Sequence, residues 1–180
     1  MNARRLVTGH DDDGKAVVVS DEMVAPVTLA LLPGGEFHQL WGTDSTMRFP
    51  DDGTIPLAPR YFPPVGGCRF MLFTVAPDAG PGLPEDLDLG SALAEFEQKL
   101  PGLAEYLEPD SPGMHTSATV DFGVVLSGQV TLELDYGTKV TLNVGDTYVQ
   151  NGTRHRWSNA GEGPAVIALV AVGADHDTVT

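Results

Sequence analysis

The sequence predicts an all-β domain, built as an antiparallel sandwich or a small barrel. Short segments rich in β-branched and aromatic residues recur along the chain and are typical of strands. Turns containing glycine and proline separate these segments at intervals of about 8–12 residues, a spacing typical of antiparallel sheets. The length of 180 residues suits one domain with a sizeable core, so residues 1–180 are predicted to form a single domain.

The N-terminal part, residues 1–76, is expected to contribute several strands. The segments with a strand-like composition are AVVVS (16–20), VTLALL (27–32), EFHQLW (36–41) and RFMLFTV (69–75). Stretches rich in proline and glycine punctuate them. Strands that precede a barrel leave sheet edges that the barrel does not cover, and such edges are places where a second chain can pair.

Residues 77–110 change in composition and are predicted to form an acidic, helical insertion. They contain nine acidic residues and a single basic one, Lys99. Apolar residues at helical spacing predict a helix near 91–99, which Pro101 ends. A short helical turn is expected after it, so the insertion is helical near 91–107. We expect this segment to be a solvated, repulsive face and not a ligand site.

The strand pattern returns after residue 113 and continues to residue 172. Apolar and polar residues alternate over 130–135, and a turn at Tyr136 leads into a partner segment. Glycine marks two further tight turns before the last segment, VIALVAV (166–172). This segment is apolar throughout, as expected for a buried final strand.

The charge balance disfavours several classes of partner. The chain has 10 basic and 25 acidic residues, a formal net charge of −15. Such a surface repels phosphate backbones and anionic lipid head groups, so neither nucleic acid nor a membrane is an expected partner. Cys68 is the single cysteine, which fits a reducing compartment. Because no leader and no stretch of about 18 apolar residues is visible, we expect a cytoplasmic protein.

Two of the five histidines lie in strand-like stretches punctuated by glycine, GMHTSATVDFGVVLSG (113–128) and GDTYVQNGTRHRWSN (145–159). An even number of steps separates His115 from Asp121, so a continuous strand would point both side chains to one face. Turns at the glycines would bring the second stretch alongside and place His155 near Asp121. Two imidazoles and one carboxylate are the ligand set of non-haem iron sites and also suit catalytic zinc. The alternative is that each histidine is an ordinary hydrogen-bonded residue in a metal-free pocket.

These two stretches resemble the two sequence motifs of the cupin superfamily. The spacing of the first motif is matched by Gly113, His115, Asp121 and Gly128, and that of the second by Gly145, Gly152, His155 and Asn159. The resemblance covers roughly residues 113–172. The whole chain is also similar to a group of small single-domain cupins that share the stretch FPPVGG (62–67).

Three positions depart from the family pattern. Ser117 stands where the family has a second histidine, Asp121 replaces its glutamate, and Gln150 replaces its proline. The resemblance implies an antiparallel double-stranded β-helix, that is, a jelly-roll barrel, and a homodimer. It also implies a divalent metal ion (iron, zinc, manganese or nickel), for which His115, Asp121 and His155 are the candidate ligands. With one family ligand replaced by serine, a vestigial, metal-free site is the alternative.

Further residues are candidates for the wall of a substrate pocket. The candidates are Ser117, Gln150, Trp157, Arg69, Met71, Phe73, His38 and Tyr61, the last together with its neighbour Phe62. An arginine beside apolar groups is a plausible anchor for a substrate carboxylate or enolate, although Arg69 could equally extend to the surface. A surface or interface position is at least as consistent with His38, and Gln150 could bind a ligand or hold its own loop.

These observations predict a metal-dependent enzyme that acts on a small organic molecule by oxygenation, dehydration, isomerisation or decarboxylation. No nucleophile motif, phosphate loop or dinucleotide fingerprint is visible, so the chemistry would depend on the metal and on nearby acid–base groups. Two alternatives remain: a non-catalytic binder of small molecules without metal, and a structural or regulatory protein whose barrel only dimerises.

Overall fold

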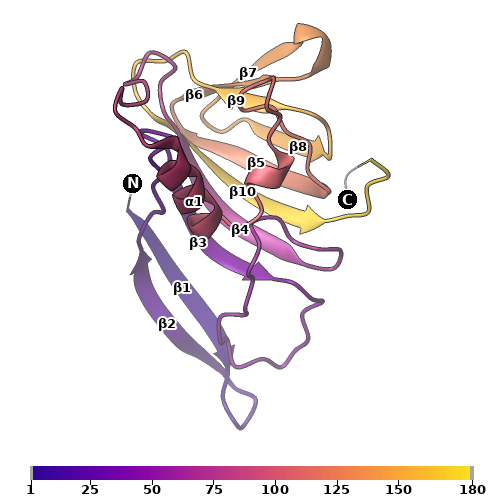
Figure 1. The fold of residues 1–180 in the computed structure, drawn as a ribbon. Coiled ribbons are helices and arrows are strands. Elements are labelled where there is room, and N and C mark those ends of the chain that lie inside the picture. The colour runs from indigo at the N-terminus through magenta and orange to yellow at the C-terminus, as the bar shows by residue number, and fades with distance from the viewer. Residues whose placement is uncertain (1, 179–180) are drawn as a thin grey trace.

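The computed structural model describes residues 2–178 and shows three antiparallel sheets (Figure 1). The large sheet has the strand order β3-β4-β10-β5-β8, the small sheet β7-β6-β9, and a separate hairpin β1-β2. The strands are β1 (Ala3–His10), β2 (Ala16–Val24), β3 (Glu36–Thr43), β4 (Cys68–Val75), β5 (Thr119–Ser127), β6 (Gln129–Glu133), β7 (Lys139–Asn143), β8 (Thr147–Asn151), β9 (Arg156–Ser158) and β10 (Ala165–Gly173). The predicted all-β, antiparallel fold is confirmed.

The central strand of the large sheet is β10, which pairs with β4 on one side and β5 on the other. A strand with neighbours on both sides is shielded from water, which explains its continuous apolar sequence. Its residues Ala165 and Ile167 pack with Val125 of β5 and Val130 of β6 in a core that joins the large sheet to the small one. The barrel therefore closes around the strand that the sequence predicts to be buried.

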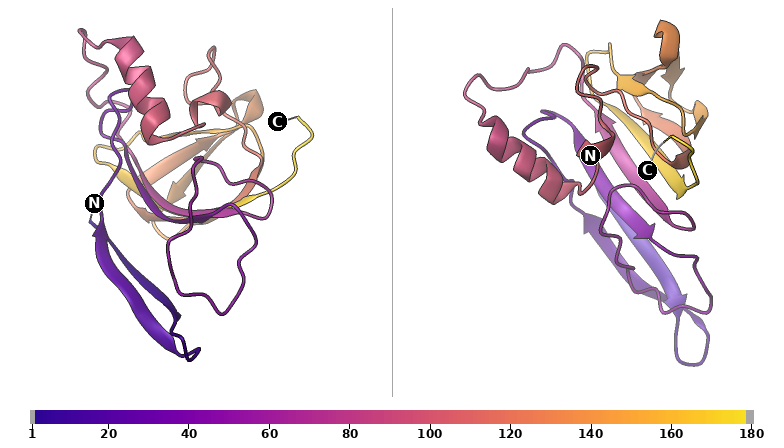
Figure 2. Two further views of the ribbon diagram at one scale, coloured as in Figure 1. Left: turned by 60° about the horizontal axis from the view of Figure 1, so that its bottom comes forward. Right: turned by 45° about the vertical axis from the view of Figure 1, so that its right-hand side comes forward.

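The predicted helix is present as α1 (Leu89–Lys99), which lies outside the sheets (Figure 2). Asp88 caps its first turn by accepting a hydrogen bond from the Gly90 backbone, and Lys99 stands in its last turn. A short 3-10 helix follows at Ala104–Tyr106, as expected for the insertion. No helix among the described residues is long and apolar enough to span a membrane.

One predicted strand is wrong. Within residues 27–32, only Val27 makes a strand-like bridge, to Phe37, and the chain then turns. The reason is that the apolar residues of this segment are used elsewhere: Leu29 packs in a cluster with Phe96 of α1 and with Leu100. Two hydrogen bonds add to this contact, because Glu95 accepts from the Ala30 backbone and Lys99 donates to the carbonyl of Thr28.

The hairpin of β1 and β2 extends away from the two larger sheets (Figures 1 and 2). Its first strand has no strand-like composition, but cross-strand ion pairs of Arg4 with Asp21 and of Arg5 with Glu22 support it. Three large apolar side chains of the hairpin, Leu6, Val18 and Met23, are more than half exposed. Exposed apolar surface of this kind is typical of interaction sites. The homodimer stays a prediction.

The packing of α1 predicts unequal effects of two substitutions on the same helix. Phe96 is only 3% exposed, whereas Leu93 is 56% exposed. Phe96→Ala is expected to lower the free energy of unfolding by about 3–5 kcal/mol, because it leaves a cavity in the cluster around Leu29. Leu93→Ala should change it by no more than about 0.5 kcal/mol. Urea denaturation of both variants makes the comparison, and equal effects would contradict this account of the helix.

Candidate functional site

His115 and His155 lie directly opposite each other in the structure. Each backbone N–H donates to the carbonyl of the other residue, at 3.0 Å from His115 and 2.9 Å from His155. Side chains of directly opposed residues project to the same face of a sheet, and the centroids of the two imidazole rings are 4.2 Å apart. The two histidines that the sequence singles out are thus brought together, although forty positions separate them.

The hydrogen bonds of the two rings determine which nitrogen is free. Nδ1 of His115 lies 3.2 Å from the carbonyl of Gly113, and Nδ1 of His155 lies 2.8 Å from that of Thr153. A carbonyl only accepts, so the proton of each neutral ring is assigned to Nδ1 and the lone pair to Nε2. Burial lowers the pKa of His115, and burial together with the neighbouring His115 lowers the pKa of His155 to about 4. Both rings are therefore neutral at neutral pH, which is the form that binds metals.

Asp121 occupies the inner face of β5, opposite Gln150 of β8 and Ala171 of β10. It is 8% exposed, and its Oδ1 has no hydrogen-bond partner among the described residues. Burial raises the pKa of this carboxyl to about 6, against the opposing effect of a hydrogen bond with the Thr119 side chain. The carboxylate thus retains an open acceptor position inside the barrel.

The histidine pair suits a metal ion, whereas the complete predicted ligand set is not assembled. Two neutral imidazoles with free Nε2 atoms and backbone-bound Nδ1 atoms are the usual arrangement of metal-binding histidines. Within residues 2–178, however, no group of three His, Cys, Asp or Glu side chains is close enough to hold a metal ion. Asp121 as the third ligand therefore stays a prediction.

A cavity of about 410 Å³ lies beside the histidine pair, and His115, Asp121 and His155 all line it. Seven rings surround it, each in contact with the next and the last with the first, at centroid distances of 4.2–6.4 Å. In order of contact, this aromatic girdle consists of Phe37, Tyr61, Phe62, His115, His155, Trp157 and Phe73. The girdle makes the walls flat and largely apolar.

Tyr148 is a cavity residue that the sequence reasoning missed. Its ring packs on Trp157, with centroids 4.8 Å apart, and its backbone pairs with Gly123 of β5. A Cβ at Gly123 would lie 2.2 Å from the ring of Tyr148, so this ring position depends on glycine. Burial and the charge of Asp121 raise the pKa of both Tyr148 and Tyr61, which keeps the two phenols protonated. The signal in the sequence was the two-residue step from Tyr148 to Gln150, a candidate pocket residue, because such a step keeps both side chains on one face of a strand.

The other predicted pocket residues divide into two groups. Met71, Phe73, Trp157 and Tyr61 line the cavity, as do the three candidate ligands. As far as the described residues define its wall, Ser117, Gln150, Arg69 and His38 are not part of it. Ser117 instead hydrogen-bonds Thr119 at 2.8 Å, and the amide of Gln150 donates to the carbonyl of Thr153 at 3.0 Å. Gln150 therefore holds the turn that leads to His155.

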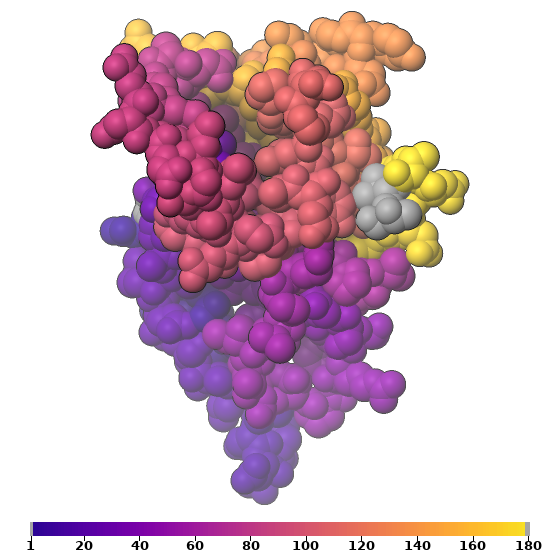
Figure 3. Space-filling view, viewed as in Figure 1, coloured from indigo at the N-terminus to yellow at the C-terminus, as the bar shows by residue number. Residues whose placement is uncertain are grey.

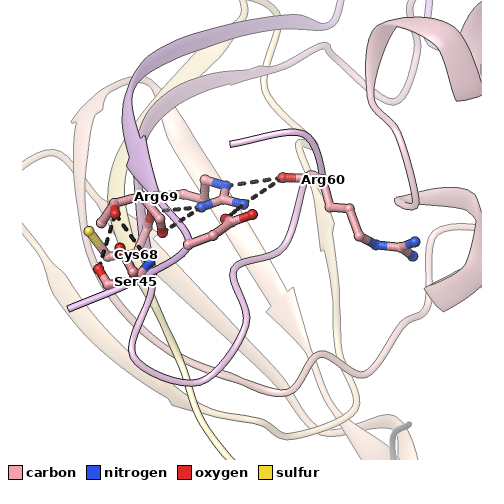
Figure 4. A network of polar contacts seen from close by, with 6 residues as sticks. Ser45, Arg60, Cys68 and Arg69 are labelled. Atoms are coloured by element: carbon pink, nitrogen blue, oxygen red, sulfur yellow. Dashed lines mark hydrogen bonds and ion pairs between the residues drawn. The ribbon is translucent and has the colours of Figure 1, made fainter. Parts of the chain in front are cut away.

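Arg69 does not serve as the substrate anchor considered from the sequence. Its guanidinium makes five hydrogen bonds: two to the carbonyl of Arg60, one each to those of Thr43 and Cys68, and one to the Asp44 carboxylate (Figure 4). These bonds equal the full donor capacity of an arginine. Arg69 shares a strand face with Met71 but belongs to a structural network at the end of that strand.

His38 is likewise separated from the cavity by the geometry of its strand. It follows Phe37 on β3, and successive side chains of a strand point to opposite faces. Phe37 lines the cavity, so His38 lies on the other face of the sheet, where it is 1% exposed. The candidate position at the barrel mouth is wrong for this residue.

The acidic insertion is more than a solvated face. Phe96, Leu103 and Leu107, from α1 and the segment after it, are part of the cavity wall. The surface is hollowed between α1 and this following segment (Figure 3). The expectation that residues 77–110 form only a solvated face is thus wrong on the apolar side, because composition shows the acidic residues but not which way the apolar ones face.

The chain has recognisable relatives among known proteins. Residues 104–172 match the family model of the cupin domain. A stretch of 70 residues is 39% identical to Oryzines biosynthesis cluster protein J of Aspergillus oryzae and covers 39% of this chain and 35% of that protein. Another match, 27% identical, joins 86% of this chain to 63% of the cupin-domain-containing oxidoreductase fogC of Aspergillus ruber. Both matches span less than two thirds of the relative's length.

Among solved structures, a cupin 2 conserved barrel domain protein of Salinispora arenicola is similar, with 17% identity, 82% of each chain covered and a TM-score of 0.43.

The buried carboxyl of Asp121 predicts a pH-dependent effect of Asp121→Asn. The pKa of this carboxyl is about 6 in the folded protein and about 3.9 in an unfolded chain. Between these two pH values the folded wild type therefore binds more protons than the unfolded chain does. Its free energy of unfolding therefore falls as pH rises through this window. Asn does not titrate, so the variant should gain on the order of 2 kcal/mol relative to wild type between pH 4 and pH 7.

Chemical denaturation in the presence of a chelator measures this difference. Asp110→Asn, at an exposed position, is the control and should show no such gain. A difference between Asp121→Asn and wild type that does not change with pH would contradict the burial of this carboxyl.

The contact between Gly123 and Tyr148 predicts a coupled pair of substitutions. Gly123→Ala should cost roughly 1–3 kcal/mol of stability, because the new methyl group displaces the Tyr148 ring. The cost should shrink when Tyr148 is replaced by leucine, which a double-mutant cycle measures. Gly163→Ala is the control, since nothing lies within 4 Å of a Cβ there. If Gly123→Ala costs the same stability when residue 148 is tyrosine and when it is leucine, the Tyr148 ring is not what the new methyl group displaces.

Proposed function

We propose that this chain, which belongs to the cupin superfamily, is an enzyme that oxidises a small organic molecule in the cavity within the aromatic girdle, using a divalent metal ion held by His115 and His155. The observation that carries the proposal is the directly opposed histidine pair on the cavity wall, with both rings neutral and both Nε2 atoms free. The relative named a cupin-domain-containing oxidoreductase supports oxidation as the reaction class.

When bound, a divalent metal would supply Lewis acidity that polarises a carbonyl or hydroxyl oxygen and, in the case of iron or manganese, the capacity to activate dioxygen. Asp121 is the carboxylate of the cavity wall with an unpartnered oxygen. We assign it to the metal as the anionic ligand, which would offset part of the ion's charge.

The remaining cavity residues bind and orient the substrate in this proposal. The girdle excludes water and presents flat apolar surface, which favours a planar substrate. Tyr61 and Tyr148 stay protonated, so their hydroxyl groups are hydrogen-bond donors for a substrate oxygen. No basic side chain is needed to fix the substrate in this arrangement.

A second function, the binding of a small molecule without catalysis, is favoured by one observation. Among residues 2–178, no three metal-binding side chains are grouped closely enough to hold an ion. A neutral histidine pair can serve as hydrogen-bond acceptors for a ligand, and the cavity would then be a binding pocket only. The metal content of the protein distinguishes these two functions.

Elemental analysis of untagged protein, dialysed against a weak chelator, tests the metal site. Wild type is expected to retain a divalent metal ion in a ratio near one per chain. His115→Gln and His155→Gln should each reduce the metal content at least about tenfold, because each removes one of two nitrogen donors. Asp121→Asn should reduce it as well, since it removes the anionic ligand.

His10→Gln is the matched control, because His10 lies on the distant hairpin and should leave the metal content unchanged. Wild type that holds no metal after purification, and none after incubation with Fe(II), Zn(II), Mn(II) or Ni(II), would contradict the metalloenzyme and leave the binding function.

A further inference from the structure

Among residues 2–178, no cationic side chain lines the cavity within the girdle. Among the described residues that line it, none is a lysine or an arginine, and the acidic residues are Asp78 and Asp121. The Nδ1 atoms of His115 and His155 face the backbone carbonyls of Gly113 and Thr153, which leaves their Nε2 atoms toward the cavity as acceptors. An anionic group that entered this cavity would lose its hydration without gaining a counter-ion from the protein side chains.

Three arginines adjacent in sequence or on the same strand to residues of the site are bound by other partners. Arg154 and Arg156 flank His155, but Arg154 pairs with Glu108 and Asp135, and Arg156 pairs with Glu133. The guanidinium of Arg69 uses all five donors in its own network. The guanidinium groups of these three arginines are thus paired with carboxylates or carbonyls and are not part of the cavity wall.

The remaining wall is apolar and aromatic. Away from the histidine pair, the cavity extends between residues 31–35 and the apolar side of α1, with Phe96, Leu103 and Leu107 in its wall. Near the pair, polar groups offer both donors, the hydroxyls of Tyr61 and Tyr148, and acceptors, the free imidazole nitrogens. This combination suits a ring system with an oxygen substituent at one end.

We propose that the substrate is an uncharged molecule built on an aromatic or fused ring system that carries a hydroxyl or carbonyl oxygen, and that carboxylates and phosphates are rejected. The identification of this molecule as a substrate rests on the proposed function, whereas the binding preference rests on the cavity wall alone. An organic cation is disfavoured as well: of the two carboxylates in the described lining, Asp78 accepts from the Asn159 backbone and Asp121 has an unpartnered oxygen. A buried ion pair with Asp121 alone would gain little over the cost of removing the cation from water.

Three probes of nearly equal shape and different charge test the proposal: 2-naphthalenemethanol, 2-naphthoate and 2-naphthylmethylammonium. Isothermal titration calorimetry at pH 7.5 measures their binding to the protein as purified and after treatment with a chelator. The alcohol is expected to bind at least about tenfold more tightly than either charged probe in both samples, because burying an unpaired charge costs more than burying a hydrogen-bonded hydroxyl.

A carboxylate that binds as tightly as the alcohol to the protein as purified would overturn the proposal, and so would tightest binding of the ammonium. Failure of all three to bind would also overturn it, since the cavity would not accept a fused ring. These outcomes are independent of metal content and activity, which decide the proposed function separately.

Two variants test the donor role of the tyrosine. Tyr148→Phe removes one hydroxyl from the cavity and should weaken binding of the alcohol about threefold to tenfold, while binding of 2-methylnaphthalene, which has no oxygen, stays unchanged. Tyr136→Phe is the control, because Tyr136 is fully exposed. Equal weakening for the alcohol and the hydrocarbon would show that Tyr148 only shapes the wall and would contradict its role as a donor.

Discussion

The backbone pairing of His115 with His155 is the constraint on which the site depends. Two hydrogen bonds hold these segments together and place both imidazoles on one face. The turn before His155 requires glycine at position 152. Gly152 has φ 58°, and a Cβ there would lie 3.2 Å from the carbonyl of Ser117. Gln150 closes the same turn through its amide. Loss of this pairing would separate the rings, break the girdle and expose the free nitrogens to water.

Among the described residues, the charged side chains are distributed so that no lysine or arginine lines the cavity. The excess of acidic residues lies largely outside, where it keeps the arginines around His155 paired with Glu108, Glu133 and Asp135. Surface pairs of this kind contribute little to stability. Their consequence for the site is different: they remove the nearest counter-ions for an anionic ligand, so that binding must depend on shape, apolar contact and hydrogen bonds.

The acidic insertion links fold and function because its two sides have different roles. The side of α1 that carries Phe96 packs on the segment around Leu29 and continues into the cavity wall. Glu95 and Lys99, on its border, bind the backbone of residues 28–30. The helix therefore contributes to the cavity wall and is held to residues 28–30 by these hydrogen bonds.

The sequence by itself determined the fold class, the helix near 91–99, the buried final strand and the pair of histidines, because each depends on local periodicity or on motif spacing. It indicated Met71, Phe73 and Trp157 as wall residues through alternation along a strand, and Tyr61 through its place before the proline-glycine loop. The tertiary structure alone decided which of two faces a side chain uses and which partner it meets. Arg69 and His38 have the right residue types for a pocket, but one is saturated by backbone carbonyls and the other lies behind the sheet. Tyr148 enters the cavity because Gly123, twenty-five positions earlier, leaves room for its ring. Residues 27–32 have strand composition but pack on a helix. In each case the outcome depends on contacts between segments that are distant in the sequence, and the periodicity of the sequence does not predict such contacts.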